Sequence, residues 1–159
     1  MGLGLGNRLS SSQYYFSDSI TRAVLFDGTD DIVTVSDDDS LSFTIDPGIG
    51  ISMWLNLDSS QEHGIINKDE EYNLHIATNG RITWLTVDDS VDKRKRWSSS
   101  TGVFEFDQWN HVYVVVADLG GGGRVDPLVY YNGSASAGAA TEDSSFVDLE
   151  NTSANLLIG

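Results

Sequence analysis

Three aspartates in one short turn are the first residues whose spacing suggests chemistry. Asp27, Asp30 and Asp31 surround Gly28 in the segment Asp27–Asp31 (DGTDD). Calcium takes roughly six to eight hard oxygen ligands, which clustered carboxylates and turn carbonyls supply. The same residues favour an Asx-type turn, in which Asp side chains accept hydrogen bonds from backbone N–H groups. We keep both interpretations, and calcium is the cofactor that we expect here.

A second acidic run consists of Asp37, Asp38 and Asp39. It lacks the Gly and Glu that follow at fixed positions in an EF-hand loop. We therefore expect a solvated loop in preference to a metal site.

The basic cluster of this acidic chain is Lys93, Arg94, Lys95 and Arg96, followed by Trp97. Such a strip could bind an anionic glycan or the acidic face of another subunit, with the indole stacked on a sugar. The alternative is an edge strand whose charges discourage aggregation. The five residues form our candidate ligand-binding set.

Motifs for catalysis are missing from the sequence. There is no cysteine, which excludes disulfides, thiolate metal sites and a cysteine nucleophile. The serine-rich stretches contain no nucleophile elbow, and Gly120–Arg124 lacks the Lys-Ser/Thr of a phosphate loop. His63, His75 and His111 lack the spacing of metal ligands, so we expect structural roles for the histidines within strands.

The segment Phe106–Ala117 (FDQWNHVYVVVA) predicts a central strand by its alternation of side chains. Because both faces carry apolar residues, we expect cover on both sides, in the middle of a sheet of a two-layer β protein. The two faces are Val112, Val114 and Val116 on one side, and His111, Tyr113, Val115 and Ala117 on the other.

Shorter alternating runs predict further strands between turn signals. Asn79-Gly80 predicts a type I′ hairpin turn, Asn132-Gly133 predicts another tight turn, and Val24–Val35 predicts a hairpin or corner. The pattern predicts an all-β sandwich or jelly roll. The expected strands are Ala23–Phe26, Ile32–Val35, Ile49–Leu57, Gly64–Asn67, Tyr72–Ala77, Arg81–Val87, the edge strand Lys93–Ser98, Leu128–Tyr131 and Leu156–Ile158, with weak strand within 134–155.

Composition limits the partners. The 159 residues include 24 acidic and 9 basic side chains, so the formal net charge is −15. Such a surface repels nucleic acid and anionic membranes and favours solubility. No apolar run is long enough to span a membrane, and the N-terminus lacks the pattern of a signal peptide.

We expect two parts, an arm over residues 1–20 and a folded domain over residues 21–159. The arm is rich in Gly and Leu, then in Ser and aromatic residues. It is either a mobile arm or one that orders against a neighbouring subunit. In the second case Tyr14, Tyr15 and Phe16 are the assembly anchors, because aromatic residues dominate interface energetics.

Several segments together resemble the laminin-G-like branch of the concanavalin A-like lectin/glucanase superfamily. They are Ala23–Val35 (AVLFDGTDDIVTV), Gly50–Trp84, Phe106–Ala137 and Asn151–Gly159 (NTSANLLIG). The resemblance implies an all-β jelly-roll sandwich of two antiparallel sheets, one of them concave, and the binding of glycans or proteins, often with calcium. Many such domains are accessory modules and not enzymes.

The chain departs from the catalytic branch of that superfamily. Related glucanases carry an ExDxxE strand motif, whose start matches Glu105 and Asp107, but Asn110 replaces its last Glu. We therefore expect no catalytic residues. The aromatic residues Trp54, Trp84, Trp109, Tyr72 and Tyr113 are expected in the core or on a sheet face, where some could stack on sugars.

The resemblance also implies a further C-terminal strand that this sequence does not contain. Either the sequence is a truncated piece of a longer chain, or another segment takes the place of this strand. For the second case our hypothesis is that the arm, Gly2–Ser19, of the same or a neighbouring chain fills the gap, since uncovered sheet edges invite strand addition.

These features favour a non-catalytic virion protein: a capsid decoration, head-fibre or tail-appendage subunit that assembles with other protein subunits and attaches to glycans. It would act on the virion or outside the cell, without contacts to nucleic acid or membrane. The alternative is a calcium-assisted carbohydrate-binding module of a secreted multidomain protein.

Overall fold

The structure is a computed structural model, and it describes residues 23–44, 48–58, 61–88, 93–117, 127–142 and 150–159. Within them, no helix is long and apolar enough to cross a membrane. The elements are β1 (Val33–Val35), the 3₁₀ turn η1 (Asp39–Leu41), β2 (Ile49–Leu55), β3 (His63–Lys68), β4 (Tyr72–Ile76), β5 (Ile82–Asp88), β6 (Lys93–Ser99), β7 (Asn110–Val116), β8 (Leu128–Tyr131), β9 (Ser134–Ala135), β10 (Gly138–Glu142) and β11 (Leu156–Ile158).

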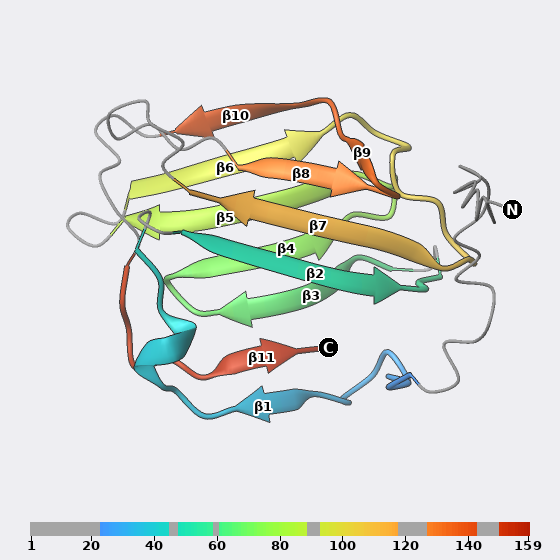
Figure 1. Cartoon of the computed structure of the whole chain (residues 1–159). Helices are drawn as coiled ribbons and strands as arrows, with labels where there is room; N and C mark the ends of the chain where they lie inside the picture. Colours follow the sequence, from blue (N-terminus) through green and yellow to red (C-terminus); the bar gives the residue numbers. More distant parts are fainter. Residues whose placement is uncertain (1–22, 45–47, 59–60, 89–92, 118–126, 143–149) are drawn as a thin grey trace, which may run out of the picture.

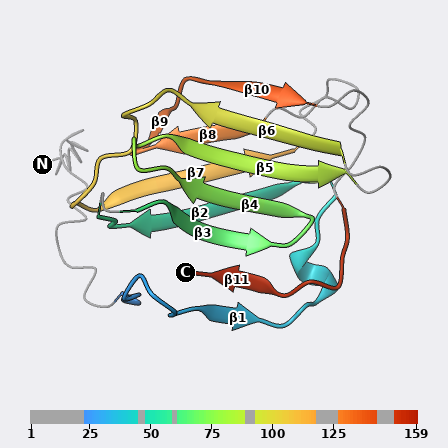
Figure 2. The same cartoon turned by 180° about the vertical axis from the view of Figure 1, so that it is seen from behind.

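The strands form two stacked sheets (Figures 1 and 2). Sheet A has the order β1-β11-β3-β4-β5-β6-β10, and sheet B has the order β2-β7-β8-β9. Every described strand pair is antiparallel. The predicted all-β jelly-roll sandwich of two antiparallel sheets is confirmed.

The core lies between the sheets and is centred on β7. Val112, Val114 and Val116 are buried, as their alternation predicts, and they join a cluster that includes Leu74 and Trp84 of sheet A. β7 lies between β2 and β8, so its central position is confirmed. Its other face is only partly buried, because in the described part no third layer covers it.

The two Asn-Gly turns differ in geometry. Asn132 and Gly133 have φ of 49° and 80°, which gives the two-residue type I′ turn between β8 and β9. At the other turn only Gly80 has positive φ, and its N–H donates to the Ala77 carbonyl oxygen at 2.8 Å. The hairpin between β4 and β5 is therefore confirmed, but the predicted type I′ turn is wrong: a three-residue loop needs left-handed backbone only at its last position.

Sheet A corrects three further expectations. Ala23–Phe26 is not a strand, and Val24–Val35 is not a hairpin, because β1 pairs with β11. β6 is not an edge strand, because β10 pairs with its residues 95–99. β10 has a weak sequence pattern for a packing reason: a Cβ on Gly138 would lie 2.3 Å from the Trp97 ring, so only a very small residue fits.

Candidate functional site

The two sheets differ in width, and this leaves one flank of the sandwich open. β1 and β11 lie beyond β3, whereas sheet B ends at β2 (Figure 1). Val33 and Val35 pair with Ile158 and Leu156, whose register continues to buried Ile66, so they belong to the inner face. Nevertheless they are 39% and 38% exposed. The inner face of β1 and β11 therefore lacks a covering strand within the described residues.

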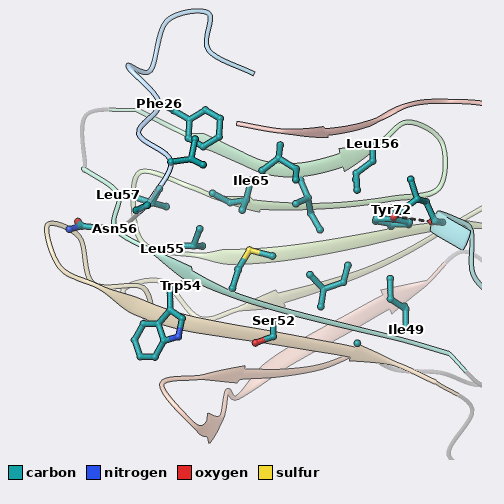
Figure 3. A pocket seen from close by; sticks show the side chains of 18 of the residues that line it. Phe26, Ile49, Ser52, Trp54, Leu55, Asn56, Leu57, Ile65, Tyr72 and Leu156 are labelled. Atoms are coloured by element: carbon teal, nitrogen blue, oxygen red, sulfur yellow. Dashed lines mark hydrogen bonds between the residues drawn. The ribbon is translucent and has the colours of Figure 1, made fainter. Parts of the chain in front are cut away.

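An apolar groove of about 760 Å³ runs along this flank, which we call the flank groove (Figure 3). The inward side chains of β2 form one wall and those of β3 and β11 form the other. Figure 3 shows Leu55, Ile65 and Leu156 around it, while Trp54 and Ser52 point away. Ser52 and Trp54 also line the groove. Since their side chains point away, these two residues border the groove through their main chain.

The edge of β2 that borders the groove carries no strand partner among the described residues. β2 pairs with β7 over all seven of its positions and with no other described strand. An antiparallel edge strand leaves alternate N–H and C=O groups without sheet partners. The groove thus combines an apolar floor with a row of main-chain hydrogen-bonding groups.

A buried ion-pair cluster around Lys68 holds the far wall in place. Lys68 is fully buried, and its Nζ lies 2.6 Å from Glu71 Oε1 and 2.8 Å from Asp37 Oδ1. It also donates to the carbonyl oxygens of Thr152 and Ala154, at 3.2 and 2.9 Å. These bonds attach the segment that leads into β11 to β3. Alternation places Lys68 inward with Ile66, a signal that the sequence analysis missed.

Burial and charge shift two pKa values at this wall. Burial alone would lower the pKa of Lys68, but its hydrogen bonds to Asp37 and Glu71, with their charges, raise it overall. Burial, with the charge of Glu71, raises the pKa of Tyr72 to about 12. The Tyr72 hydroxyl donates to the Leu41 carbonyl oxygen at 3.0 Å, which holds η1 at the end of the groove.

The structure brings the three predicted calcium ligands together. One carboxylate oxygen from each of Asp27, Asp30 and Asp31 lies within 4.8 Å of the others, and all three residues are exposed. Two oxygens on one Ca²⁺ lie at most about 5 Å apart, so the donor set fits a hard cation. Turn bonding is also present: Thr29 N donates to Asp27 Oδ1 at 2.8 Å, and Asp27 N donates to Asp31 Oδ2 at 3.0 Å.

The second acidic run is exposed and also makes contacts that support the fold. Asp37 binds Lys68, and Asp38 caps η1 by accepting a hydrogen bond from Ser40 N at 2.9 Å. Hydrogen bonds from Ser40 lower the pKa of Asp38. Asp37, Asp38 and Asp39 are exposed, as a solvated loop predicts, and Asp37 is in addition a charged partner of the buried lysine.

The structure does not bring the basic cluster onto one surface. Alternation along β6 turns Lys95 and Trp97 into the sandwich, where they are 1% and 5% exposed, and leaves Arg94 and Arg96 on the outer face of sheet A. Lys93 belongs to β6, but its side chain lies outside the described part. Trp97 pairs with Trp84 in the core, so its ring is not available to stack on a sugar.

An aromatic row lies on the outer face of sheet B. Tyr113 and Tyr130 are cross-strand neighbours with ring centroids 5.8 Å apart, and Tyr113 lies over Gly50. Trp54, 47% exposed, lies beside His111 with centroids 5.2 Å apart. Two aromatic residues of the expected set are thus on a sheet face, whereas Tyr72 and Trp84 stack in the core at 5.8 Å.

The remnant of the carboxylate motif is structural. Asn110, fully buried, donates from Nδ2 to the Glu105 carbonyl oxygen at 2.6 Å and accepts from the Tyr131 hydroxyl at 2.5 Å. It therefore holds the turn that precedes β7. No carboxylate takes its place, and Glu105 and Asp107 are exposed.

The histidines take part in separate local contacts. His75 on β4 lies 3.2 Å from Glu62, while His111 bonds Ser52 Oγ at 2.8 Å and His63 bonds the Asp58 carbonyl oxygen at 2.8 Å. Burial lowers the pKa of His75; the charge of Glu62 opposes this, and that of Arg96 adds to it. Tyr14, Tyr15 and Phe16 lie outside the described residues.

Comparison with known proteins gives one match. A family model described as "Concanavalin A-like lectin/glucanases superfamily" (Laminin_G_3) matches residues 27–159. No curated protein and no solved structure gives a significant match.

Proposed function

Because the chain belongs to the concanavalin A-like lectin/glucanase superfamily, we propose that it is a non-catalytic binding domain that assembles with other protein subunits through the flank groove. We place this assembly at a virion surface, as a capsid decoration or appendage, where copies of one chain pack side by side. Domains of this kind generally bind ligands without catalysis, and the described residues hold no paired carboxylates where the glucanase motif would require them.

The open flank is the observation that carries this proposal. Val33 and Val35 are 39% and 38% exposed on the inner face, beside Leu156 and Ile158, which line a groove of about 760 Å³. Contiguous apolar surface of this kind marks interaction sites in soluble proteins. A free sheet edge beside it adds main-chain hydrogen bonds, which favour a protein partner.

Light scattering on two charge variants of β2 tests the proposal. Met53 packs against the core from β2 and lines the groove, while its neighbour Ser52 faces outward. We expect the wild-type chain to show a multiple of 17.3 kDa, Met53→Glu to be monomeric, and Ser52→Glu to assemble as the wild type does. Circular dichroism checks the fold, and Leu156→Ala, which shortens the opposite wall without adding charge, should weaken assembly too. A monomeric wild type, or equal assembly of all four proteins, contradicts the proposal.

The aromatic row favours a second candidate function, glycan binding on the outer face of sheet B. Flat aromatic rings on a sheet face stack against sugar rings, and Tyr113, Tyr130 and Trp54 offer such rings. As a carbohydrate-binding module the protein would be monomeric, with Ca²⁺ at the Asp27–Asp31 turn. Retention of a monomer on a polysaccharide matrix would favour this alternative.

A further inference from the structure

We propose that Ser12–Asp18 of a second copy of this chain adds to the free edge of β2 as an antiparallel strand and fills the flank groove. This occupant deepens the assembly function proposed above, on which it rests, by naming the part of the partner that binds.

The shape of the groove calls for a strand. β11 and β1 lie two strand positions beyond β3, which at about 4.8 Å per strand leaves roughly 10 Å of uncovered inner face. A strand beside β2 would hydrogen-bond its free edge and place alternate side chains over Leu156 and Ile158. A small ligand would cover the apolar floor but would not satisfy the row of main-chain groups.

The alternation of Ser12–Asp18 (SQYYFSD) fits this position. Seven residues match the seven of β2. Tyr14 and Phe16 would face the apolar floor, while Gln13, Tyr15 and Ser17 would face outward with Ser52 and Trp54. Ser12 and Asp18 share the face of Tyr14 and Phe16 and would lie at the two ends of the added strand, opposite Leu55 and Ile49.

The described chain starts at the groove, which decides between one copy and two. Ala23, Val24 and Phe26 line the groove, and Figure 3 shows Phe26 beside Leu57, at the end where β2 stops. An antiparallel Ser12–Asp18 ends beside Ile49, about 20 Å away along β2. The five-residue step from Asp18 to Ala23 spans at most about 17 Å fully extended, so an antiparallel strand from the same copy would require residues 23–26 to run back along β2.

Strand direction then favours the second copy. Without such a turn back, one copy would add the segment parallel to β2, whereas all described pairs of both sheets are antiparallel. Parallel pairing is slightly less stable per residue than antiparallel pairing. Exchange of the segment between copies gives a closed dimer if it is reciprocal and an open chain if it is not.

Engineered disulfides test the occupant, since the chain contains no cysteine. In the antiparallel register centred on β2, Tyr15 lies opposite Ser52. One chain carries Tyr15→Cys and the other Ser52→Cys, and the two are unfolded, mixed, refolded together and oxidised. We expect a band at twice 17.3 kDa on a non-reducing gel, which disappears on reduction. Replacement of Ser52→Cys by Arg96→Cys, on the outer face of sheet A, should remove the band.

Two results would overturn this occupant. The first is an internal disulfide at monomer mass in the double variant Tyr15→Cys/Ser52→Cys, because it shows that the same copy fills the groove. The second is no cross-link from cysteine at Gln13, Tyr15 or Ser17 while light scattering still shows assembly, since another part of the partner then binds and the proposed function stands. If the wild type is monomeric and does not cross-link, both proposals fail.

Discussion

Lys68 Nζ lies 2.6 Å from Glu71 Oε1 on the inner face of sheet A, and both side chains are buried. Glu71 Oε1 also accepts from Thr152 N at 2.7 Å and from Ser42 Oγ at 3.2 Å. One buried pair therefore joins β3, the residue after η1 and the segment before β11. These are the elements that form the far wall of the flank groove.

Removal of the lysine should destabilise the protein strongly. We expect Lys68→Met to lower the free energy of unfolding by about 3–5 kcal/mol, because Glu71 would stay buried without its cation. Urea unfolding followed by tryptophan fluorescence measures this. The double variant Lys68→Met/Glu71→Gln should lose less than the single one, and Arg81→Met at an exposed position should lose almost nothing. A loss below about 1 kcal/mol for Lys68→Met would show that the pair is not structural.

Stability should fall in strongly alkaline solution. The pKa values of Lys68 and Tyr72 are both raised in the folded protein, that of Tyr72 to about 12. A raised pKa contributes stability that is complete below the unfolded value and is lost as pH rises through the folded value. For Tyr72 the window therefore runs from about 10 to about 12. Urea midpoints between pH 9 and pH 12 should fall, and should fall less in Tyr72→Phe; an equal fall in both proteins would assign the effect to other groups.

Calcium at the Asp27–Asp31 turn should stabilise the fold. An ion that binds only the folded state raises stability by about 2.7 kcal/mol at a hundred times its dissociation constant. We expect added Ca²⁺ to raise the melting temperature, and Asp30→Asn to abolish the rise. Asp30 is the position of choice because Asp27 and Asp31 also accept backbone hydrogen bonds of the turn. Equal melting temperatures with Ca²⁺ and with EDTA would leave an Asx-type turn as the whole role of these residues.

Glycan binding, if present, should depend on sheet B. Tyr130→Ala should weaken retention in polysaccharide affinity gels about tenfold, since one stacking contact is worth about 1.5 kcal/mol. Arg96→Ala, on the outer face of sheet A, is the matched control. If Arg96→Ala weakens binding of an anionic glycan and Tyr130→Ala does not, the glycan site lies at the exposed arginines of β6, Arg94 and Arg96.

The sequence was most informative where side-chain alternation is regular. The row Val112, Val114 and Val116 predicted a buried strand in a two-sheet sandwich, because period-2 spacing follows from strand geometry alone. The basic cluster shows the limit of such reasoning. Alternation along β6 separates Lys95 from Arg94 and Arg96. The four consecutive basic residues nevertheless suggest a single basic surface when only the sequence is considered.

Pairing partners were harder to predict, since they depend on contacts between distant segments. β10 is composed of small and polar residues, so its sequence does not predict that it pairs with β6. The structure explains the small residue at position 138, because Gly138 lies against the Trp97 ring. The flank groove has the same origin. The groove arises because the two sheets differ in width, and local sequence patterns do not predict how wide each sheet is.

Amide hydrogen exchange along β2 is the most direct test of the central claim that its free edge is covered in solution. In an antiparallel edge strand every second N–H points away from the sheet. The amides from Ile49 to Leu55 form two sets: those that point toward β7 and those that point away from it. If a strand adds to β2, both sets should exchange as slowly as the amides of β7 in the assembled wild-type protein. In Met53→Glu the set that points away from β7 should exchange fast. If the wild-type amides that point away from β7 exchange at the rate of an unprotected chain, the edge of β2 is open, which contradicts the claim that a strand covers it.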